Sequence, residues 1–324
     1  MSRPALPIDA VLPALADALA TGNAAVLVAQ PGAGKTTRVP LALLDAPWRN
    51  DGRIIVLEPR RLAARAAARQ MARLLGEDVG QTVGYRVRME ARVSSRTRIE
   101  VVTEGVFTRM ILGDPELSGI AAVLFDEFHE RSLDADLGLA LALDARALRP
   151  DLRILVMSAT IDGARVAALL EGAPVIDSPG RTFPVETFYA EPDPLQRLED
   201  QVAAATLQAL REHEGSALVF LPGQGEITRT AERLATRLPA HVELAPLYGQ
   251  LSPAEQDRAI QPAPEGRRKV VLATSIAETS LTIEGIRIVI DSGFRRVPVY
   301  EPATGLTTLA TTRVSRAGAD QRRG

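Results

Sequence analysis

The stretch Ala-Val-Leu-Val-Ala-Gln-Pro-Gly-Ala-Gly-Lys-Thr-Thr, residues 25–37, decides the fold class of this chain. An apolar run over residues 25–29 leads into a glycine-rich turn, and a helical pattern begins at Lys35. A strand, a loop and a helix in this order form the context in which such a loop binds phosphate. Gly32 and Gly34 let the backbone direct N–H groups at a phosphate, and the helix N-terminus adds the positive end of its dipole. We therefore expect the phosphate-binding residues to be Gly32, Ala33, Gly34, Lys35, Thr36 and Thr37.

Two side chains of this loop carry specific chemistry. Lys35 is expected to reach the β- and γ-phosphates of a nucleotide, and the Thr36 hydroxyl to face Mg²⁺. The chain has 38 Lys and Arg residues but only two lysines, Lys35 and Lys269, which adds weight to a lysine at this place. Ala29 stands where the usual pattern has its first glycine, so the match is imperfect. The alternative is a glycine-rich turn with a chance lysine, which the strand–loop–helix context disfavours.

An acidic pair follows a second apolar strand, at Asp126-Glu127-Phe128-His129. Two carboxylates at the end of a buried strand are costly unless they serve a cation. Asp126 is expected to hold Mg²⁺ together with Thr36 and Glu127, and Glu127 to orient or deprotonate the attacking water. The alternative is a solvated loop after the strand, and a lone histidine such as His129 is more often a packing residue than a catalytic one.

Composition excludes several classes of protein. The absence of Cys excludes disulfide scaffolds, Cys–zinc sites, iron–sulfur clusters and Cys nucleophiles, and three His are too few for a His-rich metal site. A net charge of -2 excludes a histone-like protein, and 4% aromatic residues are too few for a platform of stacked bases. We find no targeting segment and no apolar run of about 18 residues, so we expect a cytoplasmic protein without a membrane partner.

The chain alternates short apolar runs with helical periodicity, which predicts an α/β fold with mostly parallel sheets flanked by helices. The strands expected in the first half are residues 25–29, 53–58, 99–103, 122–126 and 153–157. The helices expected between them are residues 35–44, 60–75, 104–112 and 133–148. The pattern thins in the proline-rich stretch 177–194, which places one domain at residues 1–185 and a second at 186–324.

The second half repeats the alternation without a sequence repeat. Its expected helices are residues 195–214, 226–238 and 252–260, and its expected strands are 217–221, 242–246, 269–273 and 287–291. Residues 295–300 and 307–313 flank a Glu-Pro-Ala-Thr-Gly turn, which predicts a β-hairpin.

Taken in order, these motifs resemble the DEAH/RHA group of superfamily 2 helicases, and within it a bacterial type whose acidic motif commonly reads Asp-Glu-Phe-His. The resemblance covers nearly the whole chain. The matching segments are residues 32–37, 58–64, 84–88, 103–106, 126–129, 158–160, 218–223, 247–249, 273–283 and 321–324.

The resemblance implies two tandem RecA-like domains that use ATP, or another NTP, with Mg²⁺ to translocate along or unwind nucleic acid. It implies single-stranded nucleic acid as the partner, and the family favours RNA over DNA. One alternative is a nucleotide-dependent clamp that grips nucleic acid with little turnover. Another is a P-loop ATPase acting on protein machinery, against which the second-half motifs argue.

The same resemblance assigns further residues. It adds His129 to the catalytic candidates, Gln321 to the nucleotide site, and Ser158 and Thr160 to the coupling of hydrolysis with domain motion. The implied nucleic-acid contacts are Arg60, Arg61, Thr103, Gly105 and Thr274. The stripe of Arg61, Arg65, Arg69 and Arg73 is expected to be mostly a solvated helix face. Glu278 and Thr279 either act in their motif or cap a local helix.

Two departures from the family pattern carry expectations. The last motif stops at Gly324, before the two arginines that act as arginine fingers in the family, so we expect part of a longer monomeric helicase with further C-terminal domains and weak hydrolysis by this piece. Ile260 occupies the place where many relatives have a phenylalanine that stacks on adenine, which predicts loose nucleotide selectivity.

Overall fold

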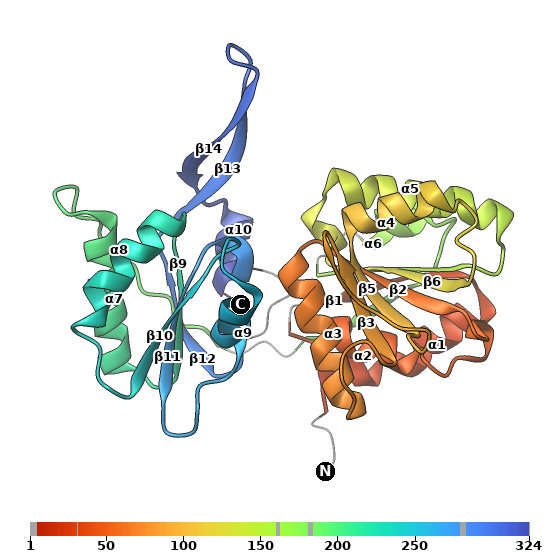
Figure 1. Cartoon of the computed structure of the whole chain (residues 1–324), viewed down its shortest axis with the longest axis horizontal. Helices are drawn as coiled ribbons and strands as arrows, with labels where there is room; N and C mark the ends of the chain where they lie inside the picture. The colour runs from red at the N-terminus through yellow and green to blue at the C-terminus, as the bar shows by residue number, and fades with distance from the viewer. Residues whose placement is uncertain (1–4, 31, 160–162, 181–183, 279–282, 324) are drawn as a thin grey trace. The chain divides into compact units, whose positions relative to one another are not determined.

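The computed structural model describes residues 5–30, 32–159, 163–180, 184–278 and 283–323. The chain folds as two compact units, Met1–Phe183 and Pro184–Gly324 (Figure 1). Thr160 and Thr279, both named by the sequence, lie outside the described residues. None of the helices in the described ranges is long and apolar enough to cross a membrane.

The first unit is built on an eight-stranded sheet with the order β4-β3-β5-β2-β6-β7-β1-β8. Its neighbours pair in parallel, except for the antiparallel pair β3 and β4. The strands are β1 (Ala24–Ala29), β2 (Arg53–Glu58), β3 (Val83–Val87), β4 (Glu90–Arg92), β5 (Ile99–Thr103), β6 (Ile120–Phe125), β7 (Arg153–Ser158) and β8 (Val175–Ser178).

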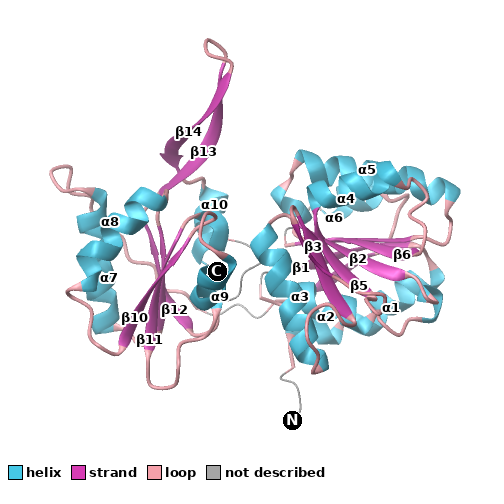
Figure 2. Cartoon of the chain, viewed as in Figure 1, coloured by secondary structure: helices cyan, strands magenta, loops and turns pink. Residues whose placement is uncertain are grey.

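Helices cover both faces of this sheet, as Figure 2 shows. One core cluster packs α1 (Leu12–Thr21), α2 (Lys35–Ala42) and α3 (Arg61–Leu75) on one face. A second cluster packs α4 (Glu104–Gly113), α5 (Leu133–Leu148) and α6 (Gly163–Leu169) on the other. The middle residues of the central strands β2, β6 and β7 are apolar because both faces of these strands are buried. The 3₁₀ turns of this unit are η1 (Pro7–Ala10), η2 (Pro47–Arg49) and η3 (Phe128–Glu130).

The strand order places the sequence motifs at one edge of the sheet. Strands β5, β2, β6, β7 and β1 run parallel and are neighbours in that order, so their carboxyl ends meet at a common edge. Glu58, Thr103, Asp126, Ser158 and the glycine-rich loop all lie at those ends. Parallel α/β sheets bind ligands at this edge.

The second unit contains a four-stranded parallel sheet with the order β10-β11-β9-β12. Its strands are β9 (Ser216–Phe220), β10 (Val242–Leu247), β11 (Arg268–Ala273) and β12 (Ile286–Asp291). Its helices are α7 (Leu198–Glu212), α8 (Gln224–Ala235), α9 (Pro253–Ile260), η4 (Ser275–Ala277) and α10 (Arg316–Arg323). Strands β13 (Phe294–Glu301) and β14 (Leu306–Arg313) form an antiparallel hairpin that projects from this unit (Figure 1).

The predicted α/β fold and the hairpin are confirmed, and the expected strands and helices fall within a few residues of the observed ones. The sequence did not indicate β3, β4, β8, α1, α6 or α10. One expectation is wrong: Arg65 does not lie on a solvated face, because its side chain is buried and its Nη1 lies 3.1 Å from Glu90 Oε2. Arg61 and Arg73 of the same stripe are exposed.

Candidate active site at the carboxyl edge of the first sheet

The glycine-rich loop has the backbone that its sequence predicts. Gly32 and Gly34 adopt φ values of +77° and +94°, in the left-handed region that side chains disfavour. At Gly34 a Cβ would also lie 2.6 Å from Leu6 Cδ1, so a side chain there would require Leu6 to move. Helix α2 begins at the next residue, Lys35. The N-terminus of α2 therefore opens directly onto the loop.

The loop and the acidic pair, about 90 residues apart in the sequence, meet in the fold. Lys35 Nζ donates a 2.9 Å hydrogen bond to Glu127 Oε1 and lies 4.0 Å from Asp126 Oδ1. The Thr36 hydroxyl donates to Asp126 Oδ2. The backbone N–H of Glu127 donates to Asp126 Oδ1 at 2.8 Å. The sequence named these four side chains, and the structure brings all of them together.

Burial and charge oppose each other in this cluster. Lys35, Asp126 and Glu127 are all buried. Burial alone would lower the pKa of Lys35, but the nearby Asp126, Glu127 and Glu58 outweigh it and raise that pKa. Burial raises the pKa of Asp126, and the charge of Lys35 opposes this rise. Two carboxylates face one ammonium group, which favours a further cation at this place.

His129 connects the acidic motif to the end of β7. Its Nδ1 accepts a 3.2 Å hydrogen bond from the backbone N–H of Ala159 and lies 3.4 Å from Glu127 Oε2. Burial lowers the pKa of His129, and the charge of Lys35 lowers it further. A neutral imidazole that accepts at Nδ1 carries its proton on Nε2. Through its own hydrogen bond to Ala159, His129 therefore joins the acidic motif to the motif that begins at the buried Ser158.

The donors in this cluster fit Mg²⁺. They are oxygen atoms: the Thr36 hydroxyl and the carboxylates of Asp126 and Glu127. Among the described residues no group of three or more His, Cys, Asp or Glu side chains forms a complete metal cage. Mg²⁺ usually binds through one or two carboxylates, and substrate phosphates and waters supply its other ligands. A few protein oxygen ligands beside a phosphate-binding loop therefore match the coordination that Mg²⁺ requires.

The residues expected to contact nucleic acid in the first unit lie at the ends of neighbouring strands β2 and β5. Arg60 is the N-cap of α3, and its Nη2 lies 3.0 Å from Glu130 Oε2. Arg61 is exposed at the first position of α3. Thr103 is the N-cap of α4, and Gly105 is the second residue of that helix. The structure thus places four of the five expected contacts along one sheet edge.

The remaining predicted residues belong to the second unit. Thr274 follows β11 and is the N-cap of η4, whereas Gln321 lies in α10. The predicted roles of both stay predictions.

Sequence reasoning missed the buried side chain next to Gln321. The guanidinium of Arg322 pairs with Glu278 Oε1 at 2.6 Å and with Asp291 Oδ1 at 2.5 Å, and it stacks 4.9 Å from the ring centroid of Phe220. Glu278 therefore accepts an ion pair within its own unit rather than only capping η4. The position of Arg322 within the last motif was the one available signal.

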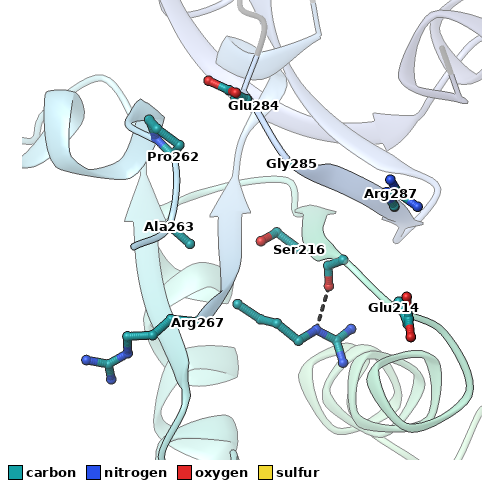
Figure 3. Close-up of a pocket in the computed structure, with 10 residues that line it drawn as sticks. Glu214, Ser216, Pro262, Ala263, Arg267, Glu284, Gly285 and Arg287 are labelled. Carbon is teal, nitrogen blue, oxygen red and sulfur yellow. Dashed lines mark hydrogen bonds between the residues drawn. The ribbon is translucent and has the colours of Figure 1, made fainter. Parts of the chain in front are cut away.

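The second unit contains a pocket of about 410 Å³ (Figure 3). It is lined by Ser216, Arg268 and Gly285, which mark the amino ends of β9, β11 and β12. The guanidinium of Arg268 donates to the carbonyls of Leu210, His213 and Gly215, so it caps the end of α7. The side chain of Arg267 points away from Ser216 in Figure 3. We assign no ligand to this pocket because its cations do not converge.

A phosphate loop beside a buried Asp-Glu pair on a parallel sheet, followed by a second parallel-sheet unit, defines a two-domain P-loop NTPase. The DEAD/DEAH box helicase family matches residues 10–169, and the helicase conserved C-terminal domain matches residues 198–321. The chain therefore belongs to the DEAD/DEAH box helicases, with two tandem RecA-like domains. The family expected from the sequence motifs is confirmed.

Known relatives support this assignment. The chain is 57% identical over 320 residues to the ATP-dependent RNA helicase HrpB of Escherichia coli (strain K12), a match that covers 98% of this chain and 39% of that protein. The crystal structure of the E. coli DEAH/RHA helicase HrpB superposes with a TM-score of 0.91 at 56% identity, covering 98% of this chain and 41% of that one. A second crystal structure, of the E. coli DExH-box NTPase HrpB, has a TM-score of 0.82 at 56% identity and covers 100% and 40%. The chain thus spans about two fifths of the length of these relatives.

Proposed function

We propose that this chain is the core of an ATP-dependent helicase that couples hydrolysis to movement along single-stranded nucleic acid. The observation that carries the proposal is the buried cluster in which Lys35 and Thr36 of the loop contact Glu127 and Asp126. A lysine and a hydroxyl on the loop, facing a carboxylate pair, are the groups that phosphoryl transfer from a nucleotide requires. The E. coli relative is an ATP-dependent RNA helicase, which favours RNA as the substrate of this chain.

Nucleotide binding would rearrange the contacts of Lys35. The backbone N–H groups of residues 32–37 would hold the phosphates, and Lys35 would move from Glu127 to the β- and γ-phosphate oxygens. Thr36 and Asp126, with Glu127, would hold Mg²⁺, which supplies charge neutralisation to the phosphate oxygens when bound. Loss of its ammonium partner would leave the Glu127 carboxylate able to orient a water and accept its proton.

His129 is proposed to report the state of this cluster to the Ser158 motif. Any shift of the acidic motif changes the hydrogen bond between His129 Nδ1 and the Ala159 N–H, which is 3.2 Å long. Ser158, with Thr160 beyond the described residues, would pass this change on as domain motion. This assignment rests on the contact itself and on the family's use of the motif.

The strand contacts proposed for Arg60, Arg61, Thr103 and Gly105 act on the nucleic-acid backbone. Arg side chains and helix N-termini recognise phosphates without reading bases. Such binding weakens as salt rises because phosphate contacts release counterions. Thr274 in the second unit would add a further contact, and Gln321 would contact the nucleotide.

The nucleotide site is tested by measuring the affinity of a fluorescent ATP analogue with and without Mg²⁺. We expect binding by the unmodified chain and at least about a tenfold loss in Lys35→Met, because a buried ammonium on phosphate contributes 1.5–3 kcal/mol or more. Arg73→Met is the matched control, since it removes one positive charge from an exposed site on α3. Equal affinities of the two variants for the ATP analogue would show that the loop does not form the nucleotide site.

A nucleotide-dependent clamp is the second candidate, since the motifs for binding are all present. A single-turnover ATPase assay, run with and without RNA, separates the two functions. A helicase core hydrolyses the bound ATP faster when RNA is present. A clamp binds RNA only when nucleotide is bound, and it does not hydrolyse that nucleotide. Unwinding of matched RNA and DNA duplexes with single-stranded tails then decides the preferred substrate.

A further inference from the structure

We propose that Glu130 occupies Arg60 in place of a nucleic-acid phosphate, and that strand binding displaces it and thereby moves the acidic motif. This inference deepens the proposed function and rests on it, because it takes Arg60 as a strand contact. Glu130 would be a positioning residue that acts through Arg60 and through the turn that carries His129.

The Arg60–Glu130 pair has the chemistry and exposure that such an exchange needs. Arg60 Nη2 lies 3.0 Å from Glu130 Oε2, and the two side chains are 27% and 19% exposed. A carboxylate and a phosphodiester both offer anionic oxygens to a guanidinium, so one can replace the other. The partial exposure lets a strand reach Arg60, while partial burial keeps the pair from being fully screened.

The surroundings of Glu130 make it dependent on Arg60. Glu104 lies half-buried nearby and accepts a 2.5 Å hydrogen bond from the Ser132 hydroxyl. Burial raises the pKa of Glu104, the Ser132 hydrogen bond and Arg60 lower it, and the charges of Glu130 and Asp134 raise it further. The charge of Arg60 therefore acts on both Glu104 and Glu130, and these two carboxylates repel each other when Arg60 turns to a phosphate.

A displacement of Glu130 reaches the acidic motif through a very short piece of chain. Glu130 closes η3, where its N–H donates to the carbonyl of Glu127 at 2.9 Å. The Arg131 N–H donates to the Phe128 carbonyl at 3.2 Å, and Glu127 and Arg131 both have positive φ values. Such a tight turn has little freedom to absorb a shift at one end. A backbone movement at Glu130 would therefore shift His129 and Glu127.

The test measures the affinity of the chain for a fluorescent single-stranded oligouridylate by anisotropy. Glu130→Gln removes the competing charge and should bind the oligonucleotide roughly two- to fivefold more tightly at low salt, the range of a partly exposed ion pair. Glu130→Asp, which keeps the charge but shortens the reach, should show a smaller gain. Asp134→Asn is the matched control for the loss of one negative charge, and it should change affinity less than Glu130→Gln.

The Arg60→Ala background isolates the pair. There Glu130→Gln should no longer tighten binding, because the guanidinium for which Glu130 and the phosphate compete is absent. A merely structural role of Glu130 would produce no gain in either background. Unchanged or weaker binding by Glu130→Gln, or the same gain in the Arg60→Ala background, overturns the inference alone. Failure of the unmodified chain to bind the oligonucleotide, or an Arg60→Ala variant with full affinity, overturns the proposed strand contact and this inference with it.

Discussion

Replacing Arg322 with methionine should destabilise the second unit strongly. The guanidinium is 1% exposed and pairs with Glu278, which is 8% exposed, and with Asp291, which is 25% exposed. It also donates to the Phe294 carbonyl at 3.3 Å and stacks on Phe220. Methionine would fill much of the volume but leave both carboxylates without their cation.

The size of the loss follows from these exposures. Removing one partner of a buried ion pair costs about 3–5 kcal/mol. Because Asp291 is partly open to water and Glu278 is not, we expect the lower end, about 3 kcal/mol. For a unit of this size that corresponds to a fall in melting temperature of roughly 10 °C.

Urea and thermal unfolding followed by circular dichroism measure this loss. The double variant Arg322→Met, Glu278→Gln should regain at least about 1 kcal/mol, since it removes the more deeply buried orphaned charge. ATP-analogue binding by the first unit serves as the internal control and should not change. A loss below about 1 kcal/mol, or no recovery in the double variant, would refute the view that this buried network holds α10 to the sheet.

Three further predictions concern the first unit and the nucleotide. Glu127→Gln should keep ATP-analogue binding but slow single-turnover hydrolysis by about 10²–10⁴-fold, and an unchanged rate would show that Glu127 is not the base. The pKa of His129 is lowered from 6.5 in the folded state. The neutral imidazole therefore contributes fully to the free energy of unfolding above pH 6.5, and this contribution is lost as the pH falls toward the pKa of the folded state. Urea unfolding should therefore show a steeper loss of stability below pH 6.5 in the unmodified chain than in His129→Gln, and parallel profiles would contradict this. With Ile260 in place of an aromatic platform, turnover of ATP, GTP, CTP and UTP should be comparable, and strict use of ATP would contradict this.

The sequence predicted the candidate site well where chemistry is local or where parallel topology brings strand ends together. The loop at Gly32–Gly34 carries its own backbone signal, and Asp126 follows an apolar strand. Carboxyl ends of parallel strands share one edge, so the meeting of Lys35 with Asp126 follows from two separate short patterns. The order of the strands, with β7 between β1 and β6, had to come from the structure.

Long-range side-chain pairing is what the sequence could not give. In a chain with 36 arginines, no local pattern distinguishes the buried Arg65 and Arg322 from the exposed Arg61. The scarcity of lysine indicated a functional residue in one of two cases. Lys35 lies in the acidic cluster, whereas Lys269 donates to the carbonyls of Arg258 and Gln261 and so caps α9.

The missed elements are short or peripheral. Strand β8 has four residues at the edge of its sheet, and β4 has three, so neither produces a long apolar run. Strand β3 contains Gly84, where a Cβ would lie 2.4 Å from the Arg92 carbonyl oxygen. Close approach of two backbones required a glycine there, which weakened the strand pattern.

The most direct test of the account is the rate of Mg²⁺-dependent ATP hydrolysis by this chain with and without saturating single-stranded RNA. The account predicts that RNA raises the rate, that high salt abolishes the rise, and that Lys35→Met removes it. A rate that RNA leaves unchanged, while the ATP analogue still binds at the loop, would contradict the claim that the site couples hydrolysis to nucleic acid.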